Sequence, residues 1–97
     1  MARRLPTRDQ FFGHLENAYN CRREEIAAQD PVTKKIVHGG RVTRTVNGDK
    51  SEYVREYVYA DNDIGPTISE YMIRKICGRL AITADDVLDH FDAALSN

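Results

Sequence analysis

The sequence predicts an α+β fold: an N-terminal helix, a long antiparallel β-hairpin with room for a third strand, and two C-terminal helices. Two kinds of observation predict this class. The pair Asn47-Gly48 separates two runs rich in β-branched and aromatic residues, and Asn-Gly is favoured in two-residue type I′ hairpin turns. In addition, Thr7, Thr67 and Thr83 each precede a stretch with helical periodicity, at the position where a threonine caps a helix. A hairpin flanked by helices follows.

The first helix is expected to run from Arg8 to about Ala28. Thr7 and Gln10 have the spacing of a capping box, in which each side chain accepts a hydrogen bond from the other residue's backbone amide. Pro31 limits the helix, because the residue before a proline avoids the α conformation. The apolar residues that fall close to one stripe are Phe11, Phe12, Leu15, Ala18, Tyr19 and Ile26. The polar outer face carries Glu16, Asn17, Asn20, Arg23 and Glu24.

The hairpin is expected to join residues 35–46 to residues 49–60 through a two-residue turn, which pairs Val46 with Asp49. In this register one face holds Ile36, His38, Gly40, Val42, Arg44 and Val46 opposite Tyr59, Tyr57, Arg55, Tyr53, Ser51 and Asp49. The other face holds Lys35, Val37, Gly39, Arg41, Thr43 and Thr45 opposite Ala60, Val58, Glu56, Val54, Glu52 and Lys50.

The base of the hairpin is expected to be sandwiched within the protein, and its polar tip to project. The reason is that apolar pairs, Val37 with Val58 and Ile36 with Tyr59, fall on both faces at the base. A hairpin of two strands has open edges, and an open edge is a template for another strand. A homodimer or a strand bound from a partner is therefore expected.

Gly39-Gly40 interrupts the first arm of the hairpin and leaves two alternatives. A bulge or bend there would shift the pairings of residues 35–38 by one and exchange their faces. A turn there would instead split the arm into two strands. Neither alternative changes the pairings nearest Asn47-Gly48.

The two C-terminal helices are expected at residues 68–80 and 84–95, after a loop at residues 60–66. Thr67 begins a capping box, and Thr83 begins a weaker, acidic variant. The inner face of the first of these helices consists of Ile68, Met72, Ile73, Ile76, Cys77 and Leu80. That of the second consists of Val87, Leu88, Phe91, Ala94 and Leu95.

Composition and charge place the chain in the class of single-domain globular proteins, with residues 1–97 as one domain. With 41% hydrophobic and 30% charged residues, it is too apolar to remain disordered. A net charge of −1 excludes the strong basic footprint of a general nucleic-acid binder. Neither a membrane-spanning run nor a secretory signal is found, so a cytoplasmic location is expected. Cys21 and Cys77 are expected to be reduced, buried thiols.

The candidate binding residues lie on one face of the hairpin: His38, Arg44, Tyr53, Arg55 and Tyr57. Aromatic rings interleaved with cations can stack bases and contact phosphates. The competing and favoured interpretation is that tyrosine is simply a good strand residue that packs its ring. The C-terminal helix pair has some of the spacing of a helix-turn-helix, but four aspartates on its second helix would repel phosphates.

No pattern in the chain is typical of catalysis, metal binding or nucleotide binding. His14 and Cys21 lie seven residues apart on the predicted helix, about 10 Å along its axis, which is too far for one zinc ion. Asp86 and His90 have the spacing of an ion pair on a helix surface. The sequence therefore predicts no enzyme, no cofactor and no metal.

The leading expectation for function is a small non-catalytic binding or regulatory protein that contacts a protein partner through the tip and open edge of its hairpin. The alternative is a nucleic-acid-binding regulator that uses the tyrosine face or the C-terminal helix pair. An enzyme with a site assembled at a dimer interface is the third reading, and it requires His38 or His90 beside Cys21 or Cys77.

Overall fold

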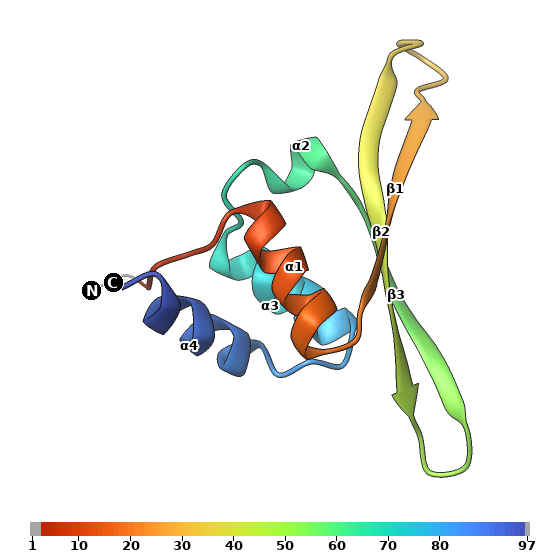
Figure 1. Cartoon of the computed structure of the whole chain (residues 1–97). Coiled ribbons are helices and arrows are strands. Elements are labelled where there is room, and N and C mark those ends of the chain that lie inside the picture. The colour runs from red at the N-terminus through yellow and green to blue at the C-terminus, as the bar shows by residue number, and fades with distance from the viewer. Residues whose placement is uncertain (1–2, 97) are drawn as a thin grey trace.

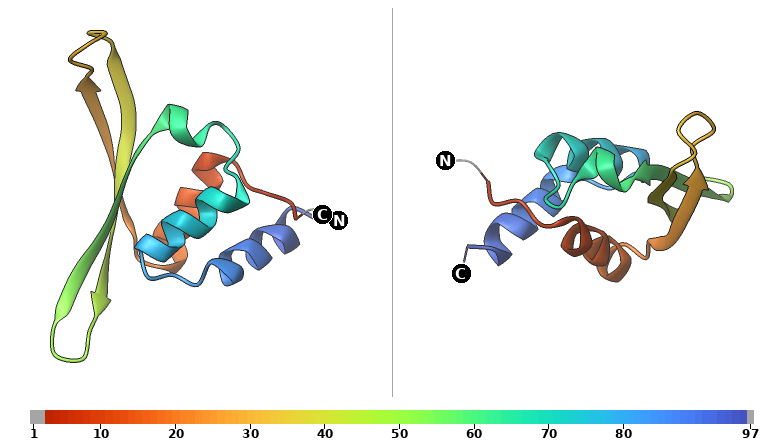
Figure 2. Two further views of the ribbon diagram at one scale, coloured as in Figure 1. Left: turned by 180° about the vertical axis from the view of Figure 1, so that it is seen from behind. Right: turned by 90° about the horizontal axis from the view of Figure 1, so that it is seen from above.

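All four helices lie on one side of a three-stranded antiparallel sheet in the computed structural model, which describes residues 3–96. The elements in chain order are α1 (Arg8–Ala18), β1 (Arg22–Gln29), β2 (Ile36–Asn47), β3 (Glu52–Ala60), α2 (Asp61–Ile64), α3 (Glu70–Arg79) and α4 (Ala84–Ala94). The strand order is β1-β2-β3, and the two turns lie at opposite ends of the sheet (Figure 1). No described element covers the other face (Figure 2). The predicted α+β class is confirmed, and the sheet has three strands; its third strand is formed by residues 22–29 and not by a split of the hairpin arm at Gly39-Gly40.

The predicted length of the first helix is wrong, because α1 ends at Ala18 and residues 22–29 form β1. Asn20 has a φ of 55°, the left-handed conformation that follows the last turn of many helices. The arginines and glutamates of residues 22–25 favour a helix in isolation, but intrinsic propensity is weak against tertiary pairing. Here that pairing is the antiparallel ladder with β2, which runs from Arg22 opposite Thr43 to the end of β1.

The hairpin between β2 and β3 exists, but its predicted two-residue turn is wrong. β2 ends at Asn47 and β3 begins at Glu52, so four residues connect the strands, and neither Asn47 nor Gly48 has the positive φ that a type I′ turn requires. Val46 pairs with Tyr53 instead of Asp49. Because this shift is four residues, an even number, each side chain stays on its predicted face while its partner changes.

The base of the hairpin is not sandwiched as predicted. Ile36 and Val37 pair with the end of β1, and both remain exposed, as does Val58 on β3. The helices instead hold the middle of the sheet, where Val42 and Tyr59 are buried. Both ends of the sheet therefore project beyond the helices, as Figure 1 shows.

Gly39-Gly40 forms neither a bulge nor a turn, because β2 runs through both residues without interruption. The glycines serve close packing instead. A Cβ atom on Gly39 would collide with the backbone carbonyl oxygen of Tyr59, and one on Gly40 would collide with the ring of Tyr59. Gly40 pairs with Tyr59 across the sheet, so the ring lies over the glycine. Contact of this kind between an aromatic ring and a glycine fixes the register of a strand pair.

The caps of the helices follow the sequence in part. The capping box of α1 is confirmed, with the Gln10 amide donating to Thr7 at 3.2 Å and the Thr7 amide donating to Gln10 at 2.9 Å. For α3 the N-cap is Ser69 and not Thr67. Thr83 occupies the N-cap position of α4, but its side chain makes no capping hydrogen bond. The predicted bounds of both C-terminal helices are otherwise close to those observed, and the predicted loop contains the single turn of α2.

The core lies between the helices and the middle of the sheet. Its fully buried large side chains come from α1, α3 and α4, from the residues that flank α3, and, in one case, from β2: Phe11, Phe12, Leu15, Val42, Ile68, Ile73, Ile76, Leu80, Val87 and Leu88. The sheet contributes little to this core. The radius of gyration of 14.6 Å exceeds the value of about 12–13 Å expected for a compact domain of this length, because the ends of the sheet project.

Replacing Gly39 tests the close packing in the middle of the sheet. We expect Gly39→Ala to lower the free energy of unfolding by about 2–3 kcal/mol, since the added methyl group meets backbone on β3. Gly13→Ala is the matched control: it adds a methyl group in open space on a helix and should raise stability by about 0.5–1 kcal/mol. Chemical denaturation followed by circular dichroism measures both. Equal stability of the Gly39 variant and the unmodified protein would contradict the packing described.

Candidate functional site

Arg44, predicted as a binding residue, joins the sheet to the helices. Its guanidinium donates hydrogen bonds to the backbone carbonyl oxygens of Tyr19 at 3.2 Å, Leu80 at 3.0 Å and Ala81 at 2.8 Å. The latter two carbonyls follow the last turn of α3, where the helix dipole favours a positive charge. The guanidinium is thus occupied by backbone at the ends of two helices.

The other predicted binding residues divide into two groups. Tyr53, Arg55 and Tyr57 lie on one face of β3, as their alternation predicts, and the structure shows that this face is turned toward the helices. The Arg55 guanidinium lies 5.5 Å from the centre of the Tyr53 ring. Tyr57 is half-buried against the core, whereas Tyr53 and Arg55 are exposed. His38 lies on the same face but six residues along β2 from Arg44, about 20 Å away.

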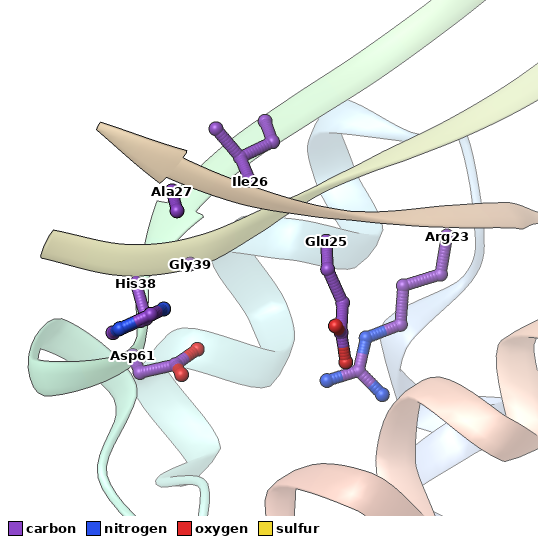
Figure 3. Close-up of a pocket in the computed structure, with 7 residues that line it drawn as sticks. All are labelled: Arg23, Glu25, Ile26, Ala27, His38, Gly39 and Asp61. Atoms are coloured by element: carbon purple, nitrogen blue, oxygen red, sulfur yellow. The ribbon is translucent and has the colours of Figure 1, made fainter.

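His38 lines a separate hollow of about 440 Å³ that lies between β1, the first residues of β2 and the first residue of α2. Figure 3 shows the side chains of Arg23, Glu25, His38 and Asp61 on the same side of the strands. The guanidinium of Arg23 is already held, because it donates to the Tyr59 hydroxyl at 2.8 Å. Burial raises the pKa of that hydroxyl, so it remains a neutral acceptor.

The charges in this hollow are largely matched. Besides its bond to Tyr59, Arg23 pairs with Asp9 at 3.5 Å, and Asp61 lies 3.8 Å from the guanidinium of Arg8. Within residues 3–96 no group of three or more histidine, cysteine, aspartate and glutamate side chains is arranged to hold a metal ion. The hollow is therefore a polar surface depression with charges of both signs, in which Glu25 forms no ion pair with another of the described residues.

The two outer strands each have backbone groups with no partner strand. The hydrogen-bonded pair next to each turn shows which residues carry these groups. The Gly48 amide donates to the Ser51 carbonyl at 2.9 Å, and the Asp30 amide donates to the Lys35 carbonyl at 2.8 Å. Hydrogen-bonded and non-hydrogen-bonded pairs alternate along an antiparallel ladder. Counting from these pairs, the outward-pointing backbone groups belong to Glu52, Val54, Glu56 and Val58 on β3 and to Arg23, Glu25, Ala27 and Gln29 on β1.

A second depression, of about 490 Å³, lies beside the free edge of β3. Glu56, Tyr57 and Val58 form one wall, and Lys75 and Arg79 of α3 form the other. Successive residues of a strand point to opposite faces, so three consecutive residues can line one depression only along the edge of the strand. We call this depression the β3–α3 groove.

The uncovered face of the sheet combines a charged centre with an apolar end. Arg41 of β2 lies between two glutamates, 4.0 Å from Glu24 on β1 and 3.5 Å from Glu56 on β3. Beyond them, a shallow depression of about 210 Å³ is formed mainly by aliphatic residues around Gly39, including Ile26, Ala28, Val37 and Val58. Val58 thus borders both this face and the groove.

The thiols and imidazoles are poorly placed for catalysis. Cys21 and Cys77 are buried, and burial raises their pKa to about 11 and about 12, so both stay protonated and weakly nucleophilic at neutral pH. The ring of His90 stacks on that of His14 at 3.9 Å rather than pairing with Asp86. Burial, followed by the charge of His90, lowers the pKa of His14.

Sequence reasoning missed the residues that form the groove on the helix side. Lys75 and Arg79 are four residues apart, which places them on one face of a helix, but nothing in the sequence shows that this face adjoins β3. The sequence also predicted that Arg23 lies on the outer face of a helix. In the structure Arg23 lies on β1, and its guanidinium carbon is 4.9 Å from the centre of the Phe12 ring.

Comparison with known proteins adds no functional assignment. No family model matches the chain, and neither the curated proteins nor the solved structures give a match. None of the helices in residues 3–96 has the length and apolar character needed to cross a membrane. A functional proposal must therefore come from the geometry of the sheet and its surroundings.

Replacing Arg44 separates a structural role from a binding role. We expect Arg44→Met to lower the free energy of unfolding by about 2–3 kcal/mol, because hydrogen bonds from a charged donor to three carbonyls are lost. Arg55→Met, on the adjacent strand and exposed, should change it by no more than about 0.5 kcal/mol. Urea denaturation of the two variants provides the comparison. An unchanged midpoint for the Arg44 variant would show that its bonds contribute nothing to stability.

Proposed function

We propose that this protein is a non-catalytic protein-binding module that adds an extended segment of its partner to an open edge of the sheet. The observation that carries the proposal is the free edge of β3, a nine-residue strand whose alternate backbone groups point away from β2. Unpaired amides and carbonyls along a strand are the main-chain partners that an incoming strand requires.

The composition of β3 supports this role. Soluble proteins usually protect an edge strand with charged side chains, above all lysine, or with proline, a bulge or a very short length. β3 carries Glu52, Arg55 and Glu56 but has no lysine, proline or bulge, and it contains three tyrosines and two valines, residues that favour strand formation. The half of β3 near the turn also projects from the helices (Figure 1), so a partner can approach it without displacing a helix.

A second copy of the chain is one partner that this chemistry admits, in agreement with the homodimer expected from the open edges. When a second copy occupies the edge, its strand forms the same kind of main-chain hydrogen bonds as a strand from a different protein would form. The proposed regulatory role is the masking or presentation of a partner's extended segment, which requires no catalytic group.

Nucleic-acid binding is the competing proposal, but fewer of the residues on which it depended are free to contact a ligand. The guanidinium of Arg44 is engaged by three backbone carbonyls, and Tyr57 is half-buried against the core. Tyr53 and Arg55 remain exposed, but two residues offer little for phosphate contacts.

Selection from a library of random displayed peptides on the intact protein tests the proposed function. We expect the selected peptides to shift the amide NMR signals of an outer strand and to slow hydrogen exchange at its outward amides, such as that of Val58. Titration with a single-stranded oligonucleotide at low and physiological salt is the parallel measurement. Peptides that perturb only the helices, or oligonucleotide binding with a steep salt dependence and no peptide binding, would contradict the proposal.

A further inference from the structure

The two edges of the sheet differ in charge, and this difference indicates which edge a partner uses. In the β3–α3 groove, Lys75 and Arg79 form no ion pair with any residue in the described range 3–96. Neighbouring cations do form such pairs: Arg74 lies 3.4 Å from Glu70 and 3.1 Å from Asp85. The groove therefore presents two exposed positive charges beside the outward backbone groups of β3.

Glu56, the one carboxylate that lines the groove, does not cancel these charges. Its side chain lies on the uncovered face, where it pairs with Arg41 at 3.5 Å. Lys75 and Arg79 lie on the other side, since α3 packs against the helix-facing side of the sheet. The strand thus separates the carboxylate from the two cations.

The edge of β1 offers no comparable excess of charge. Its outward residues include Arg23 and Glu25, and the adjoining hollow also contains Asp61 and His38. The guanidinium of Arg23 is held by Tyr59 and Asp9. An incoming strand on this edge would meet charges of both signs, because Arg22 and Arg23 are followed on β1 by Glu24 and Glu25, and the guanidinium of Arg23 is already engaged.

Strand geometry then specifies the pattern of an incoming segment. The side chains of an added strand alternate between the two faces of the sheet. Those on the helix-facing side lie toward Lys75 and Arg79, so acidic residues are favoured there. Those on the uncovered face lie beside Val54 and Val58, which are 65% and 54% exposed, and beside Glu52 and Glu56. Apolar β-branched residues are favoured next to the valines, and the two glutamates disfavour acidic residues on this face.

From these observations we infer that the docking edge is β3 and that it binds an extended protein segment in which acidic and apolar residues alternate. The inference rests on the proposed function, because it assumes that a partner adds a strand. It names the edge, the groove and the class of segment. Lys75 and Arg79 supply charge complementarity, and the outward amides of Glu56 and Val58 supply main-chain bonds.

Fluorescence anisotropy with three labelled peptides of equal length tests the pattern. The peptides alternate valine with glutamate, glutamine or lysine, and the full-length protein is the titrant. We expect the glutamate peptide to bind about tenfold more tightly than the glutamine peptide, with little binding of the lysine peptide. The advantage of the glutamate peptide should shrink as salt rises, because exposed charges are screened.

Variants of the protein test the location. Lys75→Gln with Arg79→Gln should reduce binding of the glutamate peptide to the level of the glutamine peptide. Arg22→Gln, an exposed arginine on the opposite edge strand, is the charge control and should leave binding unchanged. Val58→Pro removes one outward amide from β3 and should weaken binding about tenfold or more, whereas Ala27→Pro removes one from β1 and should have no effect. Circular dichroism checks that each variant folds. If a proline variant does not fold, the charge variants still test where the peptide binds.

Several results would overturn the inference. Equal affinity for all three peptides contradicts the acidic pattern, and loss of binding in Ala27→Pro but not in Val58→Pro contradicts the choice of edge. Either result leaves strand addition itself standing. Failure of all three peptides to bind also overturns the inference, while the library selection decides the proposed function independently. An oligonucleotide that displaces the glutamate peptide and loses affinity in the Lys75 and Arg79 variant would assign the groove to nucleic acid.

Discussion

The packing of Tyr59 over Gly40 is the contact on which the rest of the structure depends. The ring stacks on Phe12 with its centre 4.7 Å away, and its hydroxyl accepts a hydrogen bond from Arg23. One side chain of β3 therefore joins β1, β2 and α1 at a single point. It also fixes the register of the sheet, because only glycine at position 40 leaves room for the ring.

Because the sheet is attached near its middle, most of its surface remains available. Arg44 provides the second attachment, four residues farther along β2, by binding backbone at the ends of α1 and α3. Beyond these two points both ends of the sheet project, one face is uncovered, and both outer strands lack a neighbour among the described residues. The β3–α3 groove arises from this arrangement, since a helix that packs against the middle of the sheet leaves the strand edge beside it open.

The features that could be predicted from the sequence are those set by local patterns. The capping box at Thr7 and the apolar stripes of the C-terminal helices depend on neighbouring residues, and alternation alone assigned Tyr53, Arg55 and Tyr57 to one face. β1 could not be predicted, because its arginines and glutamates favour a helix until β2 is present to pair with them. The register of β2 and β3 places the Tyr59 ring over Gly40, and this contact outweighs the preference of Asn-Gly for a two-residue turn. The candidate site depended on contacts distant in sequence, such as those that engage the guanidinium of Arg44 and those that place α3 beside β3.

Amide hydrogen exchange along β2, measured by NMR on the intact protein, tests the central attachment most directly. The central strand is hydrogen-bonded on both sides, so differences in protection along it report how firmly each part of the sheet is held. Protection should be greatest at Gly40 and Val42 and should decrease toward both Ile36 and Asn47. Uniform protection from Ile36 to Asn47, or a maximum at either end, would contradict a sheet held at its middle with free ends.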